Sequence, residues 1–257
     1  MNEIRARIER IRRINEAYMY LELATDDERL AKIKPGSSLL ARRIDPDDDA
    51  IEHWDPYLRD QWYPAGFTKA GNLLIEMRFS YRYRPGMHYS VLGPIGKPYR
   101  FRKSLRNVLL VADDAPPLPL TIMIQQLLHN KISVTLVLLG EAQKYTTDHL
   151  APEVEVIRGT GTLEWTDQVM TLGWADQIFV VVNQDDELLR FARFYEKVEQ
   201  LRTQVPQNYI FGVFQMPMPC GVGACGACMM RFDKEIVPAC TQGPTFDLTR
   251  VQLPKLG

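Results

Sequence analysis

The chain has 257 residues, of which 46% are hydrophobic and 25% charged, with a formal net charge of −1 and a pI near 6.4. These values are typical of a soluble globular protein of one large domain or two to three small ones. The balanced charge argues against a surface for nucleic acid or anionic membranes, and we expect neither as a partner.

The sequence also argues against secretion and membrane insertion. Residues 1–13, MNEIRARIERIRR, are charged and lack the apolar run of a secretory signal. The longest apolar runs, at 108–111, 134–139 and 178–182, are too short to cross a bilayer. We therefore expect a cytoplasmic protein, in a compartment where cysteines serve as metal ligands or nucleophiles more often than as disulfides.

The first stretch, to about residue 103, has the pattern of short strands. Residues 5–14 and 18–23 alternate polar and apolar side chains, and Asn15-Glu16 predicts a turn between them. Further turn signals follow at Pro35-Gly36, Pro85-Gly86 and Gly93-Pro94. Such spacing favours a small antiparallel β-barrel or sandwich. The acidic run at 45–49 predicts a solvated loop.

From about residue 104 to 214 strands alternate with helices. Helical spacing covers 118–129 and 187–200, and apolar strands are predicted at 108–111, 134–139, 154–157, 178–182 and 209–214. This alternation predicts a Rossmann-like α/β domain with a parallel, doubly wound sheet.

All four cysteines fall in the last stretch, 215–257, at positions Cys220, Cys225, Cys228 and Cys240. The spacing C-x4-C-x2-C followed by a distant cysteine is that of plant-type [2Fe–2S] ferredoxins, so we predict these four as iron ligands. Small residues between them suit a backbone that folds tightly over the cluster and directs N–H groups at sulfur.

Two other interpretations of this stretch fit the sequence less well. Structural zinc prefers paired C-x2–4-C knuckles, which differ from this spacing, and a disulfide does not suit a cytosolic chain. The flanking methionines either shield the cluster or form a soft apolar docking surface; they are Met216, Met218, Met229 and Met230.

The ending CGVGACGACMM…VPAC-TQGPTFDLTRVQL resembles the C-terminus of the electron-transfer subunit of type B dihydroorotate dehydrogenase, a member of the ferredoxin–NADP reductase superfamily. The resemblance implies three domains in this order: a flavin-binding β-barrel at 1–103, a nicotinamide-binding α/β domain at 104–214 and a [2Fe–2S] domain at 215–257.

The flavin element of that family is incomplete here. The resemblance implies an Arg-x-x-Ser/Thr element that binds FAD pyrophosphate, but this chain has the run Arg59-Asp60-Gln61-Trp62-Tyr63, with Asp60 in place of the arginine and Tyr63 in place of Ser/Thr. A shift of one residue restores Arg59 but places Trp62 at the Ser/Thr position, so the element is incomplete in either alignment. FAD is left as an alternative, and its candidate contacts are Arg59, Trp62, Tyr63 and Arg78. The other interpretation of the run MRFSYRYRP is an alternating strand face.

The nicotinamide elements are absent. The family's glycine-rich turn is replaced after the strand 108–111 by Asp113, Asp114 and two prolines, which lack N–H donors. The family's Cys-Gly-Pro turn is replaced by Asn183-Gln184-Asp185-Asp186. We therefore do not expect NAD(P) as a cofactor.

The preferred interpretation is an electron-transfer subunit that relays single electrons through a [2Fe–2S] cluster, with the reductase-like body as a docking scaffold. It requires a redox partner protein, a flavoprotein or iron–sulfur subunit, in a hetero-oligomer. It leaves undecided whether the chain is an enzyme and predicts no catalytic residue. One alternative is a reductase subunit with FAD, NAD and the cluster. Another is a structural protein whose cluster only stabilises the fold.

Overall fold

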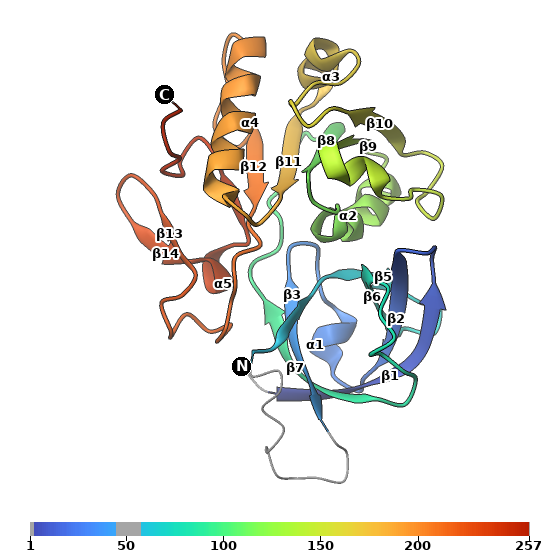
Figure 1. Cartoon of the computed structure of the whole chain (residues 1–257). Helices are drawn as coiled ribbons and strands as arrows, with labels where there is room; N and C mark the ends of the chain where they lie inside the picture. Colours follow the sequence, from blue (N-terminus) through green and yellow to red (C-terminus); the bar gives the residue numbers. More distant parts are fainter. Residues whose placement is uncertain (1–2, 45–57, 257) are drawn as a thin grey trace. The chain divides into compact units, whose positions relative to one another are not determined.

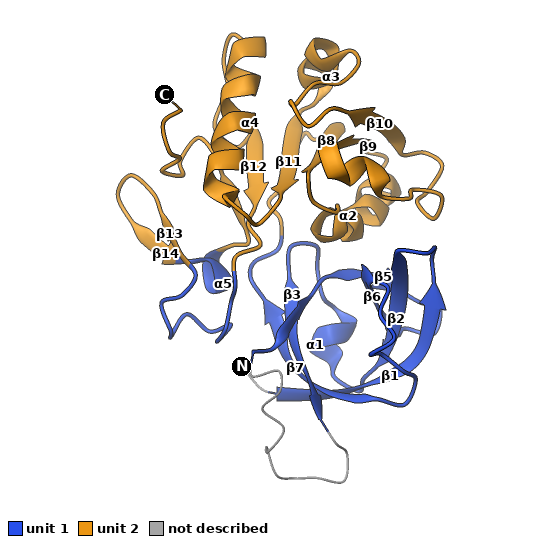
Figure 2. Cartoon of the chain, in the orientation of Figure 1, with its two compact units in different colours: residues 1–98, 217–228, 238–242 blue, residues 99–216, 229–237, 243–257 orange. Residues whose placement is uncertain are grey.

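The computed structural model describes residues 3–44 and 58–256, so the acidic run at 45–49 lies outside the described residues. The chain forms two compact units (Figure 2). The first contains residues 1–98, 217–228 and 238–242, and the second contains residues 99–216, 229–237 and 243–257. The predicted division at 103 and 214 stays a prediction.

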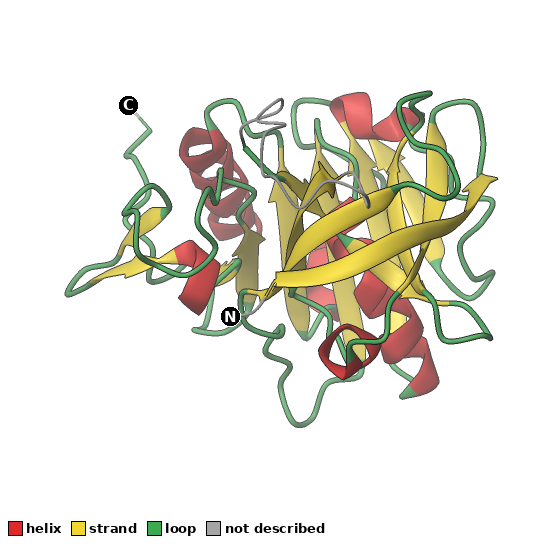
Figure 3. Ribbon diagram, turned by 90° about the horizontal axis from the view of Figure 1, so that it is seen from below, coloured by secondary structure: helices red, strands yellow, loops and turns green. Residues whose placement is uncertain are grey.

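The first unit is built on a seven-stranded antiparallel sheet with the order β4-β3-β7-β1-β2-β6-β5. The sheet is strongly curved (Figure 3), and β4 contacts β6, as in a barrel. Its elements are β1 (Glu3–Arg13), β2 (Tyr18–Ala24), α1 (Glu28–Ala31), β3 (Ser38–Ile44), β4 (Asp60–Trp62), β5 (Pro64–Phe67), β6 (Leu73–Arg78) and β7 (His88–Ile95).

Strand alternation determines which face of this sheet is buried. In β1 the side chains of Ile4, Ala6 and Ile8 are buried, whereas the residues between them are exposed. The predicted turn is confirmed: the Asn15 side-chain oxygen accepts the N–H groups of Ala17 and Tyr18, at 2.8 and 2.9 Å.

The second unit is an α/β domain with the strand order β10-β9-β8-β11-β12-β15 (Figure 1). Its strands are parallel except for β15, which pairs antiparallel with β12 at the edge. The elements are β8 (Asn107–Asp113), α2 (Leu118–His129), β9 (Ser133–Leu139), η1 (Gly140–Lys144), β10 (Glu155–Gly159), α3 (Gln168–Trp174), β11 (Gln177–Val182), α4 (Glu187–Leu201), β12 (Ile210–Val213) and β15 (Thr245–Asp247).

The doubly wound sheet predicted from the sequence is confirmed. Every residue of β11 is buried, as expected for a central strand covered by helices. Helix α3 was not predicted, because it is short and contains Gly173, a poor helix former. The C-terminal stretch adds β13 (Met229–Arg231), β14 (Ile236–Pro238) and α5 (Ala239–Gln242). Among the helices of residues 3–44 and 58–256, none combines the length and apolar content that a membrane span needs.

Phe179 lies at the centre of the parallel sheet and tests its core. The ring is fully buried and packs against Tyr99, Phe101 and Phe211, with centroid distances of 5.4–5.6 Å. Phe179→Ala removes these contacts and leaves a cavity, so we expect the free energy of unfolding to fall by about 3–5 kcal/mol. Urea unfolding followed by circular dichroism measures it.

Met170→Ala is the control, since its side chain is 73% exposed on α3 and its loss should change stability by less than about 0.5 kcal/mol. Equal losses in the two variants would contradict the assignment of Phe179 to the core.

Candidate iron–sulfur centre

The segments that carry the four cysteines pack on the barrel strands of their own unit. The Gly96 N–H, just after β7, donates a hydrogen bond of 2.9 Å to the Cys240 carbonyl. Gly221 has a φ of +65°, and a Cβ built on it would lie 2.6 Å from Ile95 Cδ1 and 3.2 Å from Leu40 Cδ1. The loop therefore contacts β3 and β7 closely, and only glycine meets both requirements at 221.

Backbone N–H groups point at the sulfur atoms, as the glycine-rich sequence predicted. Gly223, with a φ of +77°, donates its N–H to Cys240 Sγ at 3.1 Å. The Cys240 N–H donates to Cys228 Sγ at 3.5 Å. These bonds stabilise negative charge on sulfur, which is the form that binds iron.

The four thiols form two pairs. Cys220 interacts with Cys225, and Cys240 interacts with Cys228. The second pair is buried, with 1% of each residue exposed, whereas Cys220 is half-buried and Cys225 exposed. Two irons require four thiolate ligands, so this donor set fits a [2Fe–2S] cluster with one inner and one outer pair of ligands.

The surroundings of Cys220 and of Cys240 have opposite effects on the pKa of these two thiols. Burial acts to raise the pKa of Cys220, but the backbone N–H groups of Val222, Cys225 and Ala224 outweigh it and lower the pKa overall. For Cys240, burial and then the neighbouring Cys228 thiol raise the pKa. Cys220 also contributes to this rise, which places the two pairs near each other. A bound cluster would therefore have to offset the cost of ionising Cys240.

In the described ranges, no three His, Cys, Asp or Glu side chains converge closely enough to hold a single metal ion. The assignment of all four cysteines as cluster ligands stays a prediction.

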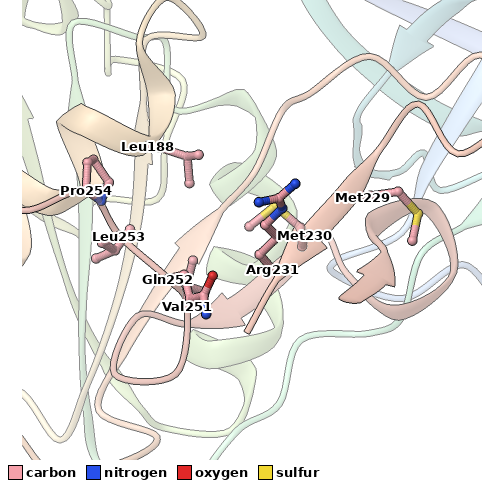
Figure 4. A pocket seen from close by; sticks show the side chains of 8 residues that line it. All are labelled: Leu188, Met229, Met230, Arg231, Val251, Gln252, Leu253 and Pro254. Carbon is pink, nitrogen blue, oxygen red and sulfur yellow. The ribbon is translucent and has the colours of Figure 1, made fainter. Parts of the chain in front are cut away.

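The methionines around the cysteines have different surroundings. Met218 and Met230 are buried, and Met218 Sδ lies 4.0 Å from Gln61 Nε2 of β4. Met229, by contrast, is 41% exposed and lines a pocket of about 400 Å³ (Figure 4). The other residues that line this pocket are Leu188, Met230, Arg231, Val251, Gln252, Leu253 and Pro254.

Arg59 and Trp62, two of the predicted flavin contacts, are used by the barrel itself. The Arg59 guanidinium donates to the Ser90 carbonyl and hydroxyl, both at 2.7 Å, and pairs with Glu3 at 2.8 Å. Trp62 is 3% exposed and packs on Tyr83 and Tyr89. Their contacts therefore do not present them to a diphosphate.

The remaining flavin candidates have less restricted positions. Tyr63 is half-buried directly after β4, and Arg78 is exposed at the end of β6, where it interacts with Tyr18. Asp60, which replaces the family arginine, pairs with Arg82 at 2.8 Å. The flavin contacts at all four candidate positions stay predictions.

Glu187 is a structurally important residue that the sequence did not indicate. As the first residue of α4, it accepts the Gln215 N–H at 2.7 Å, while Gln184 donates to the Gln215 carbonyl at 2.9 Å. Gln215 comes immediately before the stretch that carries the cysteines. Burial raises the pKa of Glu187 to about 7, although the Gln215 N–H acts in the opposite direction.

Three comparisons with known proteins complete this description. Residues 216–252 match the family model of the iron–sulfur cluster binding domain of dihydroorotate dehydrogenase B. The comparison with curated proteins finds no match. Among solved structures, an NADH-dependent reduced ferredoxin–NADP oxidoreductase aligns with a TM-score of 0.71 and 18% identity, over 96% of this chain and 90% of that one.

Phthalate dioxygenase reductase, described as a modular structure for electron transfer from pyridine nucleotides to [2Fe–2S], aligns with a TM-score of 0.55 and 13% identity. The alignment covers 91% of this chain and 87% of that chain.

The chain has the fold of the ferredoxin reductases. At residues 216–252 it carries an iron–sulfur domain of the type found in dihydroorotate dehydrogenase B, which confirms the resemblance seen in the sequence. This match supports an iron–sulfur cluster and electron transfer.

The raised pKa of Glu187 predicts a pH-dependent stability. In the folded chain the Glu187 carboxyl stays protonated up to about pH 7, whereas in the unfolded chain it ionises near its ordinary pKa of 4.5. Stability is therefore lost as the pH rises through this range. Glu187→Gln removes this loss of stability, because glutamine does not ionise, and its amide oxygen still accepts the Gln215 N–H. We expect the variant to be more stable than wild type by up to about 3 kcal/mol at pH 8, and equal to it near pH 4.

Urea unfolding at the two pH values measures this difference. Glu196→Gln, at an exposed position of the same helix, is the matched control and should behave as wild type. A difference that is the same at both pH values would show that Glu187 does not titrate in this range.

Proposed function

We propose that the chain is an electron-transfer subunit that relays single electrons through a [2Fe–2S] cluster on Cys220, Cys225, Cys228 and Cys240. The observation that carries the proposal is the arrangement of four thiols in an inner and an outer pair, with backbone N–H groups directed at sulfur. When bound, such a cluster accepts and returns one electron at a time.

The residues of the loop have separate roles in this proposal. Cys228 and Cys240 hold the inner side in a buried environment, and the Gly223 N–H stabilises charge on Cys240. Hydrogen bonds to sulfur and burial set the reduction potential. Cys225 is exposed, and the neighbouring Val222 is 48% exposed, so this side gives a redox partner its approach.

A single cluster receives its electron from one protein and passes it to another. The proposed function therefore includes a partner, a flavoprotein or an iron–sulfur subunit in a hetero-oligomer, with the reductase-like body serving mainly as a docking scaffold. The internal contacts of Arg59 support a body without its own flavin. We place the protein in the cytoplasm, because a reducing compartment keeps cysteines available as metal ligands.

The main alternative is a reductase subunit that holds FAD and NAD together with the cluster. The fold that the chain shares with phthalate dioxygenase reductase favours it. Absorbance of the anaerobically purified protein separates the two functions: a flavin band equimolar with the cluster, bleached by NADH, would establish the alternative. A chain with a purely structural cluster would instead give no reversible one-electron EPR signal.

Replacing any one of the four cysteines by serine tests the ligand set. We expect wild type to contain about two irons per chain and to give a rhombic EPR signal after dithionite reduction. Cys228→Ser and Cys240→Ser should lose the cluster, because each removes a buried ligand. Cys220→Ser and Cys225→Ser should lose most of the iron or give a shifted signal.

Val222→Ser is the matched control, as it lies in the same loop with an exposed side chain, and its iron content and signal should equal those of wild type. Full iron content and an unchanged EPR signal in Cys228→Ser or Cys240→Ser would contradict the ligand set.

A further inference from the structure

The carboxyl end of β8 is the position where an open α/β sheet normally binds its ligand. From β8 the chain proceeds to β9 and β10 on one side of the sheet, and later to β11 and β12 on the other. Ligands of such sheets bind outside the carboxyl ends of the strands, where the strand order reverses in this way. In this chain Asp113 ends β8 and Asp114 follows it.

The Asp114 carboxylate is held at this point by donors from two other elements. Its Oδ2 accepts Arg190 Nη1 of α4 at 2.8 Å, and its Oδ1 accepts the Glu141 N–H, just after β9, at 2.8 Å. Burial acts to raise the pKa of Asp114, but these two donors outweigh it and hold the pKa below its usual value. The group is therefore a carboxylate anion at neutral pH.

The Asp114 carboxylate also fills the space beside the backbone of Gly140. A Cβ built on Gly140, which has a φ of +56°, would overlap Asp114 Oδ1. A phosphate needs a close approach to backbone and free N–H donors, and here both are taken by a side chain of the protein.

The positive charge of Arg190 is already paired with acidic side chains of the protein. Besides Asp114, its Nη1 lies 3.6 Å from Asp113 Oδ2. Asp113 is 4% exposed, and its Oδ1 is buried without a hydrogen-bond partner among the described residues. Burial and then the neighbouring Asp114 raise the pKa of Asp113 to about 6. The Arg193 guanidinium also acts on Asp113, but more weakly than that of Arg190. Two carboxyl groups thus offset the positive charge at this position, and the residues present do not fit a dinucleotide.

We propose that the Asp114 carboxylate is the resident anion of this crevice, and that it makes the wild-type chain reject nucleotide phosphates, including NADH and NADPH. The inference deepens the proposed function, because it excludes a pyridine nucleotide as the direct electron donor. Its test measures nucleotide binding and does not depend on the cluster. A negative result would therefore contradict this inference without contradicting the proposed electron transfer.

Asp114→Gly provides the test, since glycine accepts the positive φ of +50° at this position and releases both donors. Isothermal titration of the full chain with pyrophosphate and with NADPH should show at least a tenfold gain in affinity over wild type. Asp186→Gly is the matched control: it has a φ of +56°, is exposed and makes no capping hydrogen bond. It removes the same charge and should bind as wild type.

Two results would overturn the proposal. One is binding of NADH or NADPH by wild type as tight as that of Asp114→Gly, which would show that the carboxylate does not block the crevice. The other is a folded Asp114→Gly variant without any gain. Asp114→Ala, which also removes the charge and empties the space, is a second variant that should also gain affinity if the glycine variant does not fold.

Discussion

The cysteine loop has room only for a hydrogen atom where Gly221 meets Ile95 and Leu40, and the geometry of the candidate centre depends on this close approach. Because the loop lies directly on β3 and β7, Gly223 is placed so that its N–H points at Cys240 Sγ. The Gly96–Cys240 hydrogen bond holds the fourth cysteine against the same strand end. The barrel strands β3 and β7 therefore fix the position of the cysteine loop and its sulfur atoms.

A second pattern is shared by two regions of the chain, one near β4 and the other at the end of β8. Near β4, Arg59 is neutralised by Glu3 and Asp60 pairs with Arg82. At the end of β8, Arg190 is shared by Asp113 and Asp114. In each region an arginine that could attract a phosphate already has an acidic partner from the protein. The scaffold can thus keep its strands and helices while the groups that bind anions are used internally.

Features that depend on local sequence were predictable. The cysteine spacing indicated the iron–sulfur domain, and the apolar periodicity predicted α2 with its observed bounds, because helical spacing over three turns is a strong signal. Pairs that are distant in sequence were not predictable. Arg190 is 76 residues from Asp114, and only the fold brings them together. Asp113 and Asp114 were noticeable in the sequence, but their shared contact with Arg190 was not predictable from it.

The contact between Gly221 and the barrel has an evolutionary consequence. Selection on the cysteine loop also acts on Leu40 and Ile95, since a bulkier side chain at either position would displace Gly221. These strand ends should therefore diverge slowly and in concert with the loop. Part of the barrel is thus constrained by the shape of the cysteine loop, independently of any ligand that the barrel itself binds.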